Sequence, residues 1–201
     1  MEKPDFAYLN DLVPDAIIDL RYASSWNFMG RPAAGYLASR PSLVRVAAEA
    51  LAQAAEDFRR QGYRLLIYDA YRPQRAVNDF ICWAQNPAEQ GNKSFFPNLA
   101  KERIFPEGYL SRHSRHSRGS AIDITLVHAD GSAMDMGGTF DLFDNRSHRD
   151  FAGLTAEQQA NRELLAGPMV AHGFGVIRSE WWHFNFVDEP YPDTYFDFEV
   201  K

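Results

Sequence analysis

The stretch that decides the fold runs Ser114-Arg115-His116-Ser117-Arg118-Gly119-Ser120-Ala121-Ile122-Asp123-Ile124-Thr125-Leu126-Val127. Its second half, 121–127, is rich in β-branched residues and predicts a strand. Its first half is polar and reaches that strand through Gly119, which lets the chain turn tightly. Within the strand, Asp123 shares one face with small neighbours that leave room for an ion. The stretch therefore predicts a loop histidine, His116, followed by a strand carboxylate.

A second motif, Glu180-Trp181-Trp182-His183, opens an aromatic run that predicts a last strand over 182–187. Positions three apart in a regular strand point to opposite faces, so Glu180 and His183 reach one site only where a bend or bulge intervenes. We expect Glu180 on a loop or bulge just before the strand and His183 inside it.

The two motifs together supply the groups of a catalytic zinc site. Such a site uses three protein ligands, an open position for water and a nearby base. The ligand candidates are His116, Asp123 and His183. Glu180 is the candidate base, and His113 competes with His116 for the ligand role. Without a metal, Asp123 would cap a turn, His116 would be satisfied in its loop, and Glu180 would form a surface ion pair.

Arg72 lies where the strand predicted over 64–70 runs into a proline, Pro73. The proline keeps Arg72 extended, which favours a rigid guanidinium at the strand end. Fixed positive charge there would stabilise a developing oxyanion by on the order of 3 kcal/mol, and Asp69 is placed to orient it. The alternative is an Asp69–Arg72 ion pair that only ties the strand end.

The remaining patterns predict an α+β fold. The expected strands cover 16–22, 64–70, 121–127 and 182–187. The expected helices run from Pro41 to Gly62, over 73–85, and from the capping box Thr155-x-x-Gln158 to about residue 166. Pro168 is expected to break or kink the last helix. The elements do not alternate as βαβ units, which favours a mixed, mainly antiparallel sheet with packed helices. The long segment 129–150 is expected to be mobile or to wrap over the site.

Composition narrows the class of protein. A chain of 201 residues suits a single domain over 1–201, and the net charge of −6 argues against nucleic-acid binding through bulk electrostatics. No apolar run approaches membrane-spanning length, and the N-terminus lacks a signal-peptide pattern. We therefore expect a cytoplasmic protein with neither nucleic-acid nor membrane partners. Its one cysteine, Cys82, excludes an intramolecular disulfide and is expected to be a buried, inert thiol.

The motif Ser114-x-His116-x-x-Gly119-x-Ala121-x-Asp123 with Glu180-x-x-His183 resembles the signature of the zinc D-alanyl-D-alanine peptidases. Further blocks narrow the resemblance to the D-Ala-D-Ala dipeptidases associated with vancomycin resistance, and it extends over essentially the whole chain. These blocks are Asp19-Leu20-Arg21-Tyr22-Ala23 with Asn27-Phe28-x-Gly30, Asp69-Ala70-Tyr71-Arg72-Pro73, and Met136-Gly137-Gly138-Thr139-Phe140-Asp141.

The resemblance implies a zinc peptidase fold with one Zn²⁺ per chain, bound by His116, Asp123 and His183. It also implies that Glu180 is the catalytic base and that Arg72 stabilises the transition state.

By the same resemblance, a small closed pocket accepts a free dipeptide, and the substrate-binding candidates are Asp141, Ser114 and Tyr22. The chain departs from the family at 136–141, which reads Met-Gly-Gly-Thr-Phe-Asp where the family reads Met-Gly-Thr, one residue, then Phe-Asp. This departure changes the loop and leaves the dipeptide preference open.

The function expected from the sequence is zinc-dependent hydrolysis of free D-Ala-D-Ala, in antibiotic resistance, cell-wall recycling or nutrient use. A D,D-carboxypeptidase or endopeptidase acting on longer cell-wall peptides is the first alternative. It would need an open groove in place of one roofed by the 22–31 and 129–150 loops. A non-catalytic zinc-binding module is the second, and the presence of Glu180 and Arg72 counts against it. The oligomeric state is left open, with a homodimer as one option.

Overall fold

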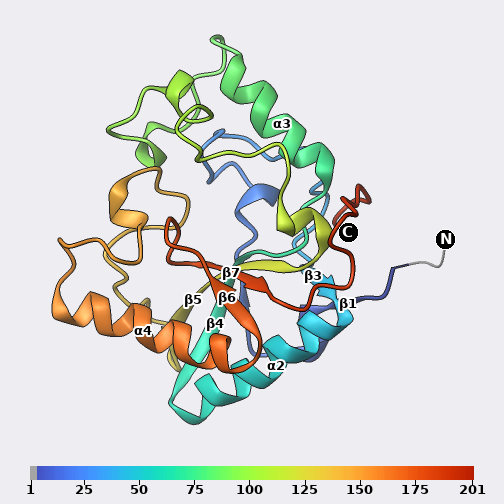
Figure 1. Cartoon of the computed structure of the whole chain (residues 1–201), viewed down its shortest axis with the longest axis vertical. Helices are drawn as coiled ribbons and strands as arrows, with labels where there is room; N and C mark the ends of the chain where they lie inside the picture. Colours follow the sequence, from blue (N-terminus) through green and yellow to red (C-terminus); the bar gives the residue numbers. More distant parts are fainter. Residues whose placement is uncertain (1–3) are drawn as a thin grey trace.

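The computed structural model describes residues 4–201, and a five-stranded sheet lies at the centre of the fold (Figure 1). Its strand order is β2-β4-β5-β7-β6. The strands are β2 (Ile17–Ile18), β4 (Tyr63–Asp69), β5 (Ala121–His128), β6 (Phe174–Val176) and β7 (His183–Phe186). Strands β2 and β4 pair in parallel, and the other neighbouring pairs are antiparallel. The predicted mixed, mainly antiparallel sheet is confirmed.

Two long helices, α2 (Arg45–Arg60) and α4 (Ala156–Ala171), lie side by side against the sheet, where α2 contacts β4 and α4 contacts β6 (Figure 1). Helix α3 (Gln74–Gln85) lies away from them, at the top of the view. The smaller elements are α1 (Leu9–Leu12) and a ladder of β1 (Phe6–Tyr8) with β3 (Ser42–Val44). Short 3₁₀ turns connect the rest: η1 (Arg21–Ala23), η2 (Lys93–Phe95), η3 (Lys101–Arg103), η4 (Arg115–Arg118) and η5 (Asn145–Ser147).

The first expected strand, 16–22, is much shorter than predicted. Strand β2 ends at Ile18, and Arg21–Ala23 form a 3₁₀ turn instead. The backbone N–H of Asp19 still donates to the carbonyl of Ile67 at 2.9 Å, so the chain leaves the sheet only after that residue. The turn then brings Tyr22 to the wall of a cavity. The last residue of the expected strand 16–22 therefore lines the cavity and does not extend the sheet.

The helix predicted to begin at Pro41 begins at Arg45 instead. Residues Ser42–Val44 pair antiparallel with Phe6–Tyr8, so they belong to a strand. Periodicity did not separate the two because a short apolar run fits a strand and a buried helix equally well. Residues 42–44 form a strand because they pair with β1, which lies far away in the sequence.

Helix α4 begins with the predicted capping box, in which the side chains of Thr155 and Gln158 each accept a hydrogen bond from the other's backbone N–H. The helix is longer than predicted, because it continues through Pro168. Buried Leu165 and Met169 lie on either side of the proline in sequence. Their packing offsets the hydrogen bond that the proline cannot make.

Cys82 is exposed, and the prediction of a buried thiol is wrong. The buried face of α3 includes Val77, Phe80 and Ile81, and Cys82 lies outside it. An apolar helical stretch does not show on which face a single residue falls, because successive residues are about 100° apart.

Within residues 4–201, no helix combines the length and the apolar character needed to cross a membrane.

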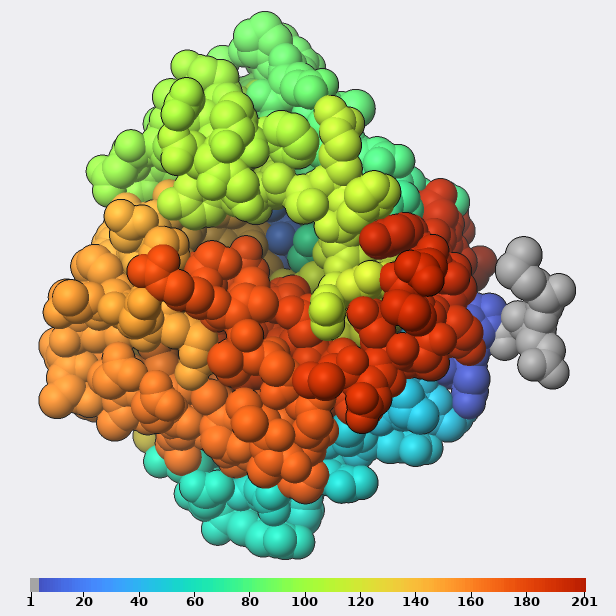
Figure 2. Space-filling view, viewed as in Figure 1, coloured from blue at the N-terminus to red at the C-terminus, as the bar shows by residue number. Residues whose placement is uncertain are grey.

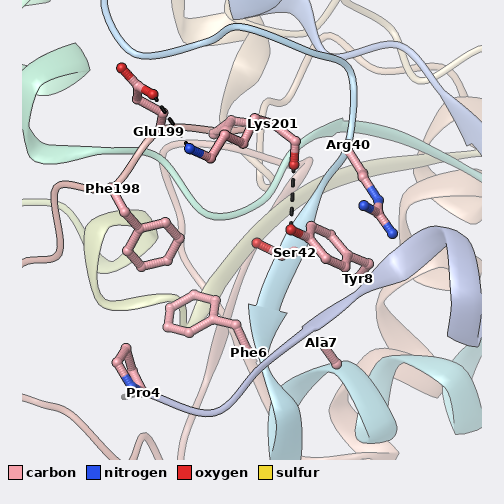
Figure 3. Close-up of a pocket in the computed structure, with 10 residues that line it drawn as sticks. Pro4, Phe6, Ala7, Tyr8, Arg40, Ser42, Phe198, Glu199 and Lys201 are labelled. Carbon is pink, nitrogen blue, oxygen red and sulfur yellow. Dashed lines mark hydrogen bonds and ion pairs between the residues drawn. The ribbon is translucent and has the colours of Figure 1, made fainter. Parts of the chain in front are cut away.

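The C-terminal segment forms a groove with β1, shown in Figure 3. The hydroxyl of Tyr8 donates to the backbone oxygen of Lys201 at 3.4 Å, and the rings of Phe6 and Phe198 meet edge to face with centroids 5.0 Å apart. The groove has a volume of about 460 Å³. None of the predicted site residues lines it, so the candidate chemistry lies elsewhere in the fold.

Candidate metal centre

All the side chains predicted to form the site line one cavity of about 310 Å³. They are Tyr22, Arg72, Ser114, His116, Asp123, Asp141, Glu180 and His183. Figure 2 shows the hollow between the yellow-green middle of the chain and the orange-to-red C-terminal part. Its volume lies at the lower end of the range for ligand pockets, which suits a small substrate.

Two neighbouring strands and one short turn carry the three ligand candidates. His116 lies in η4, Asp123 in β5, and His183 begins β7 directly opposite Asp123 in the sheet register. One ligand atom from each residue lies within 4.8 Å of the other two. His116 and Asp123 are 2% exposed and His183 is 9% exposed. The structure thus brings the three predicted ligands together at the centre of the sheet.

The turn that holds His116 depends on Gly119, which ends η4 in the left-handed region with φ of 70°. A Cβ atom at this position would overlap the ring of Phe6, so only glycine fits both the conformation and the space. At the other end of the turn, the Ser114 hydroxyl accepts a hydrogen bond from the backbone N–H of His116 at 3.2 Å. Both ends of η4 are therefore fixed next to the start of β5.

The outer nitrogen of each imidazole has its own acceptor. Nδ1 of His116 lies 2.6 Å from the carbonyl oxygen of Ala70, and Nε2 of His183 lies 2.9 Å from Oδ1 of Asn185. Each acceptor requires a protonated outer nitrogen, which leaves Nε2 of His116 and Nδ1 of His183 as lone-pair donors. These inner nitrogens are 3.2 Å apart and face the Asp123 carboxylate at 3.3 Å and 3.0 Å respectively.

This donor set favours a bound cation. Burial would raise the pKa of Asp123, but the imidazoles of His116 and His183 lower it far below its ordinary value. Burial also opposes a charge on His183, yet the hydrogen bond and the charge of Asp123 raise its pKa. Both shifts have the same cause, the close approach of a buried carboxylate to two imidazoles. Two imidazoles and one carboxylate beside a cavity fit a divalent metal with an open coordination position.

Glu180 lies beside this centre without joining it. The residue precedes β7 in an irregular segment, as predicted, and its Oε2 lies 3.7 Å from Nδ1 of His183. Its carboxylate lines the cavity. Burial raises the pKa of Glu180, and the charge of His183 offsets this only in part. A carboxylate with a raised pKa accepts a proton more readily, so this position suits a base.

Arg72 is held by neighbours on several sides. Its Nε donates to Oδ2 of Asp69 at 2.8 Å, and its Nη2 donates to Oδ2 of Asp123 at 3.3 Å. The guanidinium lies over the ring of Tyr22, 4.8 Å from the centroid. The hydroxyl of Tyr36 donates to the other oxygen of Asp69 at 2.6 Å, which fixes that carboxylate in turn. The Asp69–Arg72 ion pair therefore forms, and it also presents the guanidinium to the cavity.

Asp141 contributes a second buried carboxylate to the cavity. Its Oδ2 accepts a hydrogen bond from the Tyr22 hydroxyl at 2.6 Å. Asp141 has a φ of 57°, a left-handed conformation that aspartate tolerates better than most residues. Burial raises its pKa well above the usual range, although the Tyr22 hydrogen bond opposes this. The 129–150 segment thus wraps against the cavity, which it lines through Asp141 and Phe143.

Some placements were left open or missed by the sequence reasoning. The ligand cluster contains His116 and not His113, whose exposed ring packs against that of Tyr195 with centroids 4.7 Å apart. Asn185 was missed, although strand periodicity puts it on the same face as His183 and was the available signal. Tyr36 was also missed, because it comes from a loop without any periodic pattern.

Comparison with known proteins gives matches over the length of the chain. The peptidase M15 family model, described as D-ala-D-ala dipeptidase, matches residues 2–201. The chain is 42% identical over 198 residues to a D-alanyl-D-alanine dipeptidase of Enterococcus faecium and 41% identical over 198 residues to one of Streptomyces coelicolor, and each match covers 98% of both chains. A D-alanyl-D-alanine dipeptidase of Escherichia coli K12 is 37% identical over 173 residues, which are 86% of this chain and 80% of that relative.

Proposed function

Because this chain belongs to the D-ala-D-ala dipeptidase family of peptidases, we propose that it hydrolyses the free dipeptide D-Ala-D-Ala with one bound Zn²⁺. The observation that carries the proposal is the buried cluster of His116, Asp123 and His183 with Glu180 beside it. A site that only held a structural metal would have no use for an adjacent base of this kind.

The metal ligands in this proposal are Nε2 of His116, Nδ1 of His183 and the carboxylate of Asp123. When bound, zinc would act as a Lewis acid that polarises the scissile carbonyl and lowers the pKa of a water molecule. The Ala70 carbonyl and the Asn185 side chain keep both imidazoles in the tautomer that ligation requires.

Glu180 would accept a proton from the attacking water and deliver it to the leaving amino group. Its raised pKa favours the first of these transfers, and its position next to His183 puts it beside the metal ligands. Arg72 would face the negative charge that develops on the carbonyl oxygen. Because Asp69 already holds the guanidinium, little reorganisation is needed during the reaction.

The ends of a free dipeptide are an ammonium and a carboxylate. Asp141 and Asp123 provide negative charge for the ammonium, with the Tyr22 hydroxyl holding Asp141 in place. Ser114 lines the same cavity and is the candidate for a polar contact to the substrate. The small volume of the cavity, about 310 Å³, favours a dipeptide over a longer cell-wall peptide.

The test is a panel of free Ala-Ala dipeptides of all four chiralities, together with N-acetyl-D-Ala-D-Ala, assayed before and after chelation. We expect turnover of the free D,D-dipeptide, its loss on chelation and its recovery on addition of zinc. Faster cleavage of the N-acetylated peptide would favour the carboxypeptidase alternative instead.

The base is tested separately with Glu180→Gln. We expect kcat to fall by about 10²–10⁴-fold with the zinc content unchanged. The matched control is Glu157→Gln, which changes an exposed glutamate in the first turn of α4. Retention of wild-type kcat in Glu180→Gln would exclude Glu180 as the base.

A further inference from the structure

Arg162, in helix α4, is completely buried. Its guanidinium donates three hydrogen bonds, and all three acceptors are backbone carbonyl oxygens. Nε donates to the carbonyl of Met136 at 2.7 Å, Nη1 to that of His148 at 2.6 Å, and Nη2 to that of Arg146 at 2.8 Å. Burial, together with the nearby charge of Arg149, lowers the pKa of Arg162 to about 10. Burying a cation in this way is costly, so the contacts that it makes call for an explanation.

The three carbonyls lie at the two ends of one segment, 136–148. Met136 begins the segment, and Arg146 and His148 lie at its far end. Asp141 lies in the middle, with its left-handed backbone and its carboxylate in the cavity. The planar, rigid fork of an arginine can bridge both ends of such a loop at once, whereas the single ammonium of a lysine cannot reproduce this geometry.

The same guanidinium also contacts the segment that carries the candidate base. It lies 5.7 Å from the ring centroid of Trp181, the residue after Glu180. The backbone N–H of Trp181 donates to the carbonyl of Ser147 at 3.0 Å, so the end of the loop is joined to this segment. Arg162 therefore sits behind the wall of the cavity, outside direct reach of a substrate but in contact with what shapes that wall.

We propose that Arg162 is a positioning residue that clamps both ends of the 136–148 loop and so holds the Asp141 carboxylate at the ammonium end of the substrate. The inference rests on the role proposed above for Asp141. Left-handed Asp141 would relax to a commoner conformation if the loop were free, and its carboxylate would leave the cavity.

The hydrogen bonds from Arg162 to the two ends of the 136–148 loop should act mainly on substrate binding. The ligands His116, Asp123 and His183 lie on η4, β5 and β7, and the candidate base Glu180 precedes β7, so none of these four groups belongs to the 136–148 loop. Loss of the clamp should therefore raise KM for the free dipeptide while the zinc content and kcat change little.

The experiment combines Arg162→Lys with Asp141→Asn in a double-mutant cycle on the zinc-loaded enzyme. KM and kcat for D-Ala-D-Ala are measured well below the melting temperature, and amide hydrogen exchange is measured across 136–148. We expect Arg162→Lys alone to raise KM on the order of tenfold and to speed exchange in the loop. In the Asp141→Asn background Arg162→Lys should raise KM no further, because the carboxylate that Arg162 positions has been replaced by an uncharged amide.

The matched control is Asn161→Ala, which removes a hydrogen bond of 2.9 Å from the same helix to the carbonyl of Asp135, just outside the loop. It should leave KM unchanged. Because Arg162→Lys can fail to fold, a second variant, Ser147→Ala, removes the Ser147 hydroxyl bond to the Leu142 carbonyl inside the loop and keeps the guanidinium. It should raise KM and loop exchange together, and again only while Asp141 is intact.

Two results would overturn the proposed positioning role of Arg162. One is an increase in KM that is the same with and without the Asp141 carboxylate. The other is faster loop exchange, in either variant, with KM unchanged. A different result, an unaltered KM in Asp141→Asn alone, would instead refute the proposed role of Asp141 in binding the ammonium, which separates the two failures.

Discussion

Replacing Asn185 with leucine tests how the fold prepares the metal centre. The change removes the acceptor 2.9 Å from Nε2 of His183. The imidazole proton is then free to move to Nδ1, where Asp123 lies 3.0 Å away and would accept it in place of the metal. Loss of such an outer partner weakens metal binding by about 10–100-fold. This range corresponds to about 1.4–2.8 kcal/mol, similar to one hydrogen bond to a charged group.

The assay is a zinc titration against a chromophoric chelator, with Asn185→Asp as the matched variant. Aspartate keeps an acceptor at the same position, so we expect its zinc affinity to equal or exceed that of the wild type. At saturating zinc the leucine variant should recover kcat to within a few-fold, on the order of one lost hydrogen bond. If the leucine variant binds zinc as tightly as the wild type, or if both variants weaken equally, the tautomer argument is wrong.

Three further predictions concern the guanidinium, the turn and an ion pair. Arg72→Lys keeps the charge but loses the fork between Asp69 and Asp123, so kcat should fall about 10²–10³-fold with unchanged zinc content by metal analysis. Gly119→Ala would press a Cβ against a phenylalanine ring at a φ of 70°, so chemical denaturation should show a loss of about 2 kcal/mol in the free energy of unfolding. Burial would raise the pKa of Asp79, but hydrogen bonds from Arg31 lower it below its ordinary value of 3.8. The Arg31–Asp79 pair therefore stabilises the fold above pH 3.8, and this stabilisation is lost as the pH falls through the lowered pKa of Asp79. On acidification from about pH 5 to 3, the melting temperature of the wild type should thus fall more steeply than that of Asp79→Asn, and parallel curves would contradict this.

The central strands could be predicted from the sequence because they are long, apolar and buried. The expected 64–70 and 121–127 correspond to β4, Tyr63–Asp69, and β5, Ala121–His128. The three-residue strand Ser42–Val44 could not be predicted, since its pairing partner lies near the N-terminus and its own apolar pattern is ambiguous. The helix end predicted at Pro168 was wrong because tertiary packing of α4 outweighs the one hydrogen bond that the proline cannot make.

The candidate site was predictable as a list of residues, but the contacts that set its chemistry were not. A short spacing with a glycine indicated that His116 and Asp123 could meet, and the position of Glu180 before its strand followed from the period of two. The hydrogen bonds from the imidazoles to Ala70 and Asn185 depend on the sheet register and on the end of β4. Such contacts arise from tertiary structure, and no local pattern encodes them.

The charges that line the cavity would couple the binding of the metal to the choice of substrate. Asp123, Asp141 and Glu180 place three carboxylates around a small volume, with the guanidinium of Arg72 beside them. Burial raises the pKa of both Asp141 and Glu180, so their ionised forms need nearby positive charge. A divalent metal next to Asp123 and a substrate ammonium next to Asp141 would together supply it, and each would strengthen the binding of the other. An N-acylated peptide brings no ammonium and leaves Asp141 without a counter-charge in a buried position. On the proposed roles of Asp123 and Asp141, the cavity would select a free dipeptide by charge as well as by size, and the comparison of free and N-acetylated D-Ala-D-Ala tests that proposal directly.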